Sequence, residues 1–135
     1  MKILTLNIGR KGSWALYNST SCDSITWGKF TYKKDPMEKK EGPLRRFKNI
    51  LDDKNYHNDN INKVYYNFCD KEKEPRKEFA EVMRKFCEDK NITCDKIEYK
   101  VDDLLIAKKT HCTIEDDIEA GAVAMINLAK KQVAK

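Results

Sequence analysis

The order of β-rich and helical segments is the feature that most constrains the fold of this chain. Three short β-rich segments occupy the first 32 residues, and we predict strands at 2–8, 14–18 and 24–32. The glycine- and serine-containing connections between them are too short for a crossover, because parallel strands need a connection of about a dozen residues. These three strands are therefore predicted to form an antiparallel meander.

Helices and strands alternate after the meander, as the spacing of apolar residues changes between helical and extended periods. Pro43 near the start of one apolar stripe and Pro75 before another favour helix beginnings. The expected elements are a helix at 43–54, a strand at 61–68, a helix at 75–90, a strand at 92–98 and helices at 101–109 and 115–131. This order predicts an α/β protein with a mixed five-stranded sheet and helices on its faces.

The composition excludes several classes of protein. The 135 residues are 40% hydrophobic, enough for one core, so we expect a single domain spanning 1–135. No apolar run reaches the roughly 20 residues that cross a bilayer, and residues 1–8 lack a signal-peptide pattern, so we expect a cytoplasmic protein. Five cysteines without CxxC pairs, and two histidines, favour reduced thiols over disulfides or zinc. Four of them lie in apolar stretches and are expected to be buried, namely Cys69, Cys87, Cys94 and Cys112.

The charge is uneven along the chain. Residues 1–50 hold eleven Lys or Arg against four Asp or Glu, whereas residues 51–135 hold sixteen against eighteen. A basic N-terminal half is suited to contacts with phosphates. Lysine, however, outnumbers arginine by 22 to 5, and arginine is the residue of bidentate phosphate recognition. The charge alone therefore leaves phosphate binding and simple solvation equally open.

Six segments, in order along nearly the whole chain, resemble segments of the RuvC-type Holliday-junction resolvases of phages and prophages. They are KILTLNIGRKGSWALY, SITWGKF, LRRFKNILDD, VYYN, FAEVMRKFCEDKNITC and DDIEAGAVAMINLA. The resemblance implies a ribonuclease H-like fold. It also implies descent from nucleases that act on branched DNA and form dimers, with the helix at 75–90 contributing to the dimer contact.

The family's chemistry requires clustered carboxylates, because two divalent cations about 4 Å apart activate water and stabilise the leaving oxygen of the phosphodiester. The resemblance places these carboxylates at the ends of the first and fourth strands and in the first turns of the last helix. This sequence has Asn7, Asn67 and Gly121 at those positions. We therefore expect no catalytic residue, no metal ligand and no cofactor, and a degenerate RuvC-like protein.

Relocated acids are the alternative. Asp116, Asp117 and Glu119 lie close to Gly121 in sequence and would bind Mg²⁺ or Mn²⁺ if a metal site had been rebuilt, with Asp23 or Asp70 approaching from elsewhere. The protein would then be an active, metal-dependent, structure-selective endonuclease. We favour helix capping instead, because acids at a helix N-terminus are stabilised by the helix dipole.

Several basic residues are candidates for contacts with nucleic acid. Arg10 and Lys11 follow the first strand, in a turn that borders the catalytic cleft of the family, and Arg45 and Arg46 lie on the first helix. A further loop cluster is expected to be merely solvated, at Lys33, Lys34, Lys39 and Lys40. The family's Lys- and Gly-rich segment before the helix at 101–109 is missing. We expect binding without cleavage, to branched or duplex DNA or to a protein partner, and homodimer formation stays open.

Overall fold

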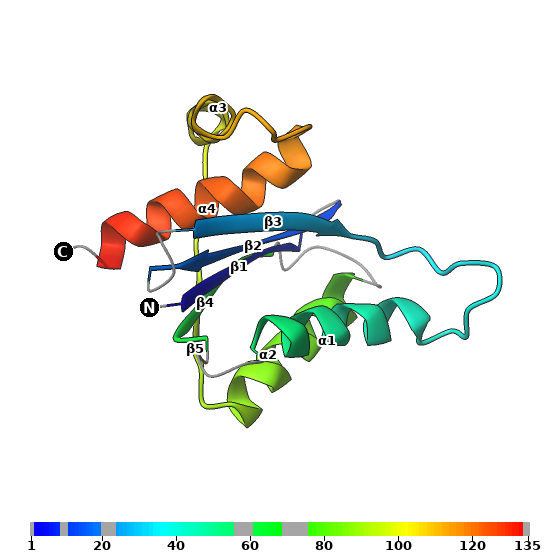
Figure 1. Ribbon diagram of the computed structural model, residues 1–135. Coiled ribbons are helices and arrows are strands. Elements are labelled where there is room, and N and C mark those ends of the chain that lie inside the picture. Colours follow the sequence, from blue (N-terminus) through cyan, green and yellow to red (C-terminus); the bar gives the residue numbers. More distant parts are fainter. Residues whose placement is uncertain (1, 9–10, 20–23, 56–60, 69–75, 134–135) are drawn as a thin grey trace.

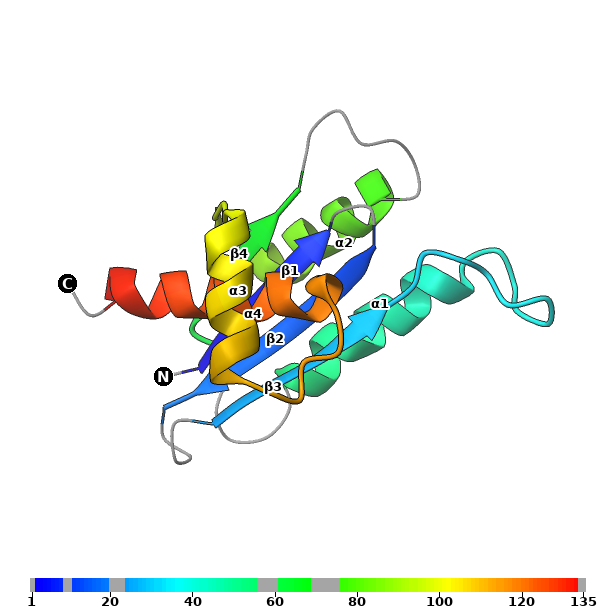
Figure 2. The same ribbon diagram turned by 90° about the horizontal axis from the view of Figure 1, so that it is seen from above.

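The computed structural model describes residues 2–8, 11–19, 24–55, 61–68 and 76–133. These residues form one five-stranded sheet with strand order β3-β2-β1-β4-β5, and helices cover both of its faces (Figure 1). The strands are β1 (Lys2–Ile8), β2 (Gly12–Asn18), β3 (Ser24–Phe30), β4 (Lys63–Asn67) and β5 (Thr93–Lys96). The helices are α1 (Gly42–Lys54), α2 (Arg76–Asp89), α3 (Val101–Thr110) and α4 (Asp117–Val133). Helices α1 and α2 lie on one face of the sheet, α4 lies on the other, and α3 packs outside α4 (Figures 1 and 2).

The predicted mixed sheet is confirmed. Strands β1, β2 and β3 pair in antiparallel fashion, and β4 joins β1 in parallel and carries β5 at the edge. Strand β3 ends two residues before its predicted end because Gly12, the first residue of β2, already pairs with Phe30. Helix α4 begins at Asp117 instead of 115 because the Asp116 carboxylate accepts a hydrogen bond from the Glu119 backbone N–H at 3.0 Å and so caps the helix.

Side chains alternate along β1 between two apolar cores. Leu4, Leu6 and Ile8 point toward α1 and α2, where all three are fully buried. Ile3 points toward α4, as expected from the period of two in a strand. All seven residues of β1 are buried, so this central strand is covered on both faces.

Two buried hydroxyl groups fix α4 on the sheet. Thr5 Oγ1 donates to the carbonyl oxygen of Ala122 at 2.8 Å, and Ser13 Oγ donates to that of Ile118 at 2.6 Å. Small residues in the helix, including Ala120 and Ala122, let its backbone approach β1 and β2 closely. This arrangement places Gly121 over the end of β1.

The cysteine predictions have mixed outcomes. Cys87 is buried in α2, as predicted, and Cys94 is partly buried. The prediction is wrong for Cys112, which is exposed because α3 ends at Thr110 and leaves Cys112 in the turn before α4. Cys69 lies outside the described residues. Within the described part of the chain, the helices are too short or too polar to cross a membrane.

Candidate nucleic-acid interface

The structure brings together the three positions at which the resemblance implies lost carboxylates. Asn7 and Asn67 are paired in the parallel register of β1 and β4, at the carboxyl ends of both strands. Asn7 is 7% exposed, and Gly121 of α4 lies directly over it. We call Asn7, Asn67 and Gly121 the neutral centre.

Tyr99 fills the neutral centre. The Asn7 Nδ2 donates a hydrogen bond to the Tyr99 Oη at 2.8 Å. A Cβ atom added to Gly121 would lie 2.5 Å from Asn7 Nδ2 and 2.8 Å from Tyr99 Oη, both closer than real contacts allow. Burial raises the pKa of the Tyr99 phenol, which therefore stays neutral near pH 7. The absence of a side chain at Gly121 is what gives this hydrogen-bonded pair its space.

The short connection between β5 and α3 brings Tyr99 to this place. Strand β5 ends at Lys96 and α3 begins at Val101, so residues 97–100 must return the chain from the sheet to the layer of α4. The Lys100 backbone N–H donates to the Asp103 carboxylate at 2.8 Å, which fixes the start of α3. Sequence reasoning noted this shortened connection but missed Tyr99. The signal was its position just beyond a parallel strand, since such strand ends meet at one edge of the sheet.

The neutral centre does not fit a pair of divalent cations. Such cations bind oxygen ligands and are held mainly by carboxylates. Here Asn7 presents an N–H group to Tyr99, and Gly121 has no donor atom. Among the residues that the structure describes, no three His, Cys, Asp or Glu side chains gather as a metal site. We therefore derive no step through a metal ion at this place.

The acids at the start of α4 are engaged in other interactions. The Asp116 carboxylate accepts from the Glu119 backbone N–H and pairs with Lys29 at 3.1 Å, and both contacts lower the pKa of Asp116. Lys29 also lies 3.8 Å from the Glu119 carboxylate, and Asp117 pairs with Lys108. These contacts agree with the capping interpretation. Two further acids of the alternative, Asp23 and Asp70, lie outside the described residues.

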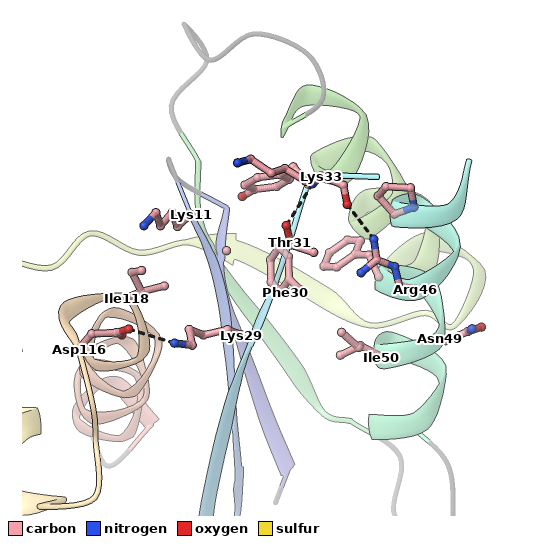
Figure 3. Close-up of a pocket in the computed structure, with 14 residues that line it drawn as sticks. Lys11, Lys29, Phe30, Thr31, Lys33, Arg46, Asn49, Ile50, Asp116 and Ile118 are labelled. Atoms are coloured by element: carbon pink, nitrogen blue, oxygen red, sulfur yellow. Dashed lines mark hydrogen bonds and ion pairs between the residues drawn. The ribbon is translucent and has the colours of Figure 1, made fainter. Parts of the chain in front are cut away.

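A cavity of about 1060 Å³ lies beside the start of α4, between β3 and α1 (Figure 3). Apolar side chains line its interior, among them Phe30, Phe47 and Ile50. Four cationic side chains stand around it, namely Lys11, Lys29, Lys33 and Arg46. We call this cavity the basic groove.

Phe30 forms the middle of the basic groove, between α4 and α1 (Figure 3). Its ring lies over Gly12 on the neighbouring strand, where a Cβ atom would come within 2.1 Å of the ring. The same ring stacks on Phe79 and meets Tyr32 edge-on, at centroid distances of 5.9 Å in both cases. Phe30 is therefore packed into an aromatic cluster beside the cations.

The four cations differ in how far they are neutralised. Lys29 pairs with Asp116, and Arg46 pairs with Glu38 at 2.9 Å and donates to the Lys33 carbonyl oxygen at the same distance. The exposed ammonium groups of Lys11 and Lys33 make no ion pair with any described residue. These two lysines supply most of the uncompensated charge of the groove.

The four predicted nucleic-acid contacts have different positions. Lys11 and Arg46 line the basic groove. Arg45 is absent from its lining and pairs at 3.7 Å with Glu41, the residue just before α1. Arg10 lies outside the described residues. The sequence analysis missed Lys29 and expected Lys33 to be merely solvated in a loop. Neither could be assigned to the groove from the sequence, because the groove forms only where β3 and α1 come together.

The strand order, with an antiparallel meander joined in parallel to two further strands and helices on both faces, defines a ribonuclease H-like α/β fold. The structure is similar to that of RuvC from Thermus thermophilus, with a TM-score of 0.62 over 98% of this chain and 97% of that chain. The two sequences are 10% identical, so this similarity establishes the fold alone. No protein-family model and no curated protein matches the sequence.

Proposed function

We propose that this RuvC-like protein binds nucleic acid in the basic groove and does not cleave it. One observation carries the proposal: the Asn7–Tyr99 hydrogen bond, packed against Gly121, fills the place where the resemblance expects catalytic carboxylates. The protein has kept the ribonuclease H-like scaffold while the charge of its centre has changed from acidic to neutral. The cationic groove reaches α4 at Ile118, three residues before Gly121.

Electrostatics support binding without metal. Carboxylates without bound cations repel phosphate, and neutral Asn and Gly side chains remove that repulsion. The ammonium groups of Lys11 and Lys33 then attract phosphates, and each neutralised phosphate releases a condensed counterion.

A combined gel-shift and nuclease assay tests the proposal. The substrates are a four-way junction, a duplex and a single strand, each with Mg²⁺ or with Mn²⁺. We expect retarded complexes, intact strands, and affinity that falls steeply with salt. The Lys11→Glu/Lys33→Glu variant should bind at least about tenfold more weakly, because reversal turns two attractions into repulsions.

A matched variant controls for net charge. Lys85→Glu/Lys90→Glu changes the charge by the same amount at exposed positions on and just beyond α2. An equal loss of affinity in the two double variants would contradict binding in the groove. No retardation of any substrate by the parent protein would contradict nucleic-acid binding and favour a protein partner.

The endonuclease alternative requires relocated carboxylates, and its signature is cleavage by the unmodified protein. Restoring the family's acids is a separate experiment. Asn7→Asp, Asn67→Glu and Gly121→Asp would not suffice together, because a side chain at position 121 meets the Tyr99 hydroxyl. We expect metal-dependent cleavage only when Tyr99→Ala is added to this triple variant.

A further inference from the structure

Exposed apolar side chains gather on one helix. Among the described residues, four large hydrophobic side chains are at least half exposed, and three of them belong to α3. They are Val101 at 72%, Leu105 at 51% and Ile106 at 52%, and the fourth is Met37 at 97% in a loop. Clustered exposed apolar residues mark interaction surfaces more often than scattered ones do.

The exposed residues of α3 lie on one side of the helix. At 100° per residue, a single outward side carries Val101, Leu105 and Ile106 together with Asp102 and Lys109. The opposite side holds the buried Ala107, which packs against α4. Helix α3 is the outermost layer on this side of the sheet (Figures 1 and 2). We call these five outward residues the outer face of α3.

Helix α2, which the family resemblance implicates in dimer contact, carries a different outer surface. Its exposed positions are all charged, namely Lys77, Glu78, Glu81, Arg84, Lys85, Glu88 and Asp89. Its apolar residues, including Phe79 and Met83, are buried against the sheet. An apolar contact between two copies is therefore available on α3 and not on α2.

We propose that the outer face of α3 joins two copies of this chain, with the two α3 helices antiparallel about a twofold axis. Charge complementarity favours a second copy over an unrelated partner. The face has an acid near one end, Asp102, and a base near the other, Lys109, and neither makes an ion pair with a described residue. In a twofold contact the same patch must complement itself, and an antiparallel pair achieves this.

The sequence of α3 fixes the register of this pair. An axis between Leu105 and Ile106 brings each Asp102 opposite Lys109 of the partner subunit. The same axis places Leu105 opposite the partner's Ile106, so apolar contacts occupy the centre and ion pairs the two ends. Since one ten-residue helix forms the contact, the interface is small, and we expect a weak, reversible dimer.

The contact leaves the basic groove accessible. Helices α3 and α1 lie on opposite sides of the sheet, and α1 forms one wall of the groove (Figure 1). Two grooves would therefore remain open in the dimer. The proposal does not depend on what the groove binds.

Sedimentation velocity over a range of protein concentrations tests the dimer. We expect concentration-dependent dimerisation in the parent, and a dissociation constant raised about tenfold or more by Asp102→Lys or by Lys109→Asp. The double variant Asp102→Lys/Lys109→Asp should restore dimerisation, because it exchanges the two charges. Leu105→Ser should also weaken the dimer, and Met37→Ser should leave it unchanged, since Met37 is exposed elsewhere.

Three results would overturn the proposal. They are a parent that stays monomeric throughout the concentration range, a dimer that Leu105→Ser does not weaken, and a double charge exchange that fails to restore what the single changes remove. The substituted positions are exposed, so we expect each variant to fold. Far-UV circular dichroism checks this, because Asp102 and Lys109 lie in the first and last turns of α3, where exchanging their charges opposes the helix dipole.

Discussion

Replacing Gly121 by alanine tests the packing of the neutral centre. In most helix interiors this change stabilises the protein by roughly 0.8–1 kcal/mol, because alanine is the better helix former. Here the added Cβ would lie 2.5 Å from Asn7 Nδ2 and 2.8 Å from Tyr99 Oη. The structure therefore predicts a change of opposite sign.

The size of the effect follows from the two groups that must move. Forcing one carbon into a packed site costs about 1–3 kcal/mol, and displacing the Asn7–Tyr99 hydrogen bond costs about 0.5–1.5 kcal/mol. After subtracting the gain in helix propensity, we expect Gly121→Ala to lower the free energy of unfolding by about 1–3 kcal/mol. For a chain of 135 residues, Tm should fall by roughly 3–10 °C.

Urea denaturation followed by circular dichroism measures the change. The control is the same substitution in an Asn7→Ala/Tyr99→Ala background, where both contacted side chains are truncated. There Gly121→Ala should be neutral or stabilising. A stabilising Gly121→Ala in the otherwise unchanged protein would refute the close packing of Tyr99 and Asn7 against α4.

Further predictions concern stability at acid pH, thiol accessibility, the Tyr99 hydrogen bond and metal binding. Because the Glu119 backbone N–H and Lys29 lower the pKa of Asp116, its ionised form stabilises the fold above the ordinary value of 3.8, and this contribution is lost as the pH falls through the lowered pKa. Asp116→Asn should thus flatten the pH dependence of Tm below about pH 4. An unchanged pH dependence in this range would contradict the capping of α4 by the Asp116 carboxylate. Burial raises the pKa of Cys87 to about 12, so alkylation at pH 8 followed by peptide mass spectrometry should find Cys112 modified first and Cys87 only after unfolding. Tyr99→Phe should lower the free energy of unfolding by about 1–2 kcal/mol in urea, because the Asn7 amide loses its partner. Sub-millimolar Mg²⁺ or Mn²⁺ should not raise Tm beyond the effect of ordinary salt, and a clear rise would reveal a rebuilt metal site.

Much of the fold could be predicted from the sequence because the relevant signals are local. The period of two in the first 32 residues and the apolar stripes of the later helices specify elements, and their order leaves few topologies. The resemblance placed Asn7 and Asn67 at the ends of the first and fourth strands, and the parallel pairing of β1 and β4 brings them together. Element ends were less accurate, as at Phe30, because they depend on how many residues the neighbouring strand offers for pairing.

The contents of the site were harder to predict because they depend on contacts between distant segments. Tyr99 lies 92 positions from its hydrogen-bond partner Asn7. Its place just beyond a parallel strand indicates the edge of the sheet but does not identify that partner. The basic groove likewise combines Lys11 with Arg46 of α1 and Asp116 at the start of α4. The exposed position of Cys112 depends on where α3 ends, which apolar spacing does not specify.

The central claim is binding without cleavage beside a neutral centre. Its most direct test is one titration of the unmodified protein into a labelled four-way junction with Mg²⁺, read both as anisotropy and, after denaturation, as strand length. We expect saturable binding that weakens as salt increases, with every strand intact at all protein concentrations. Mg²⁺-dependent strand cleavage by the unmodified protein would contradict the claim.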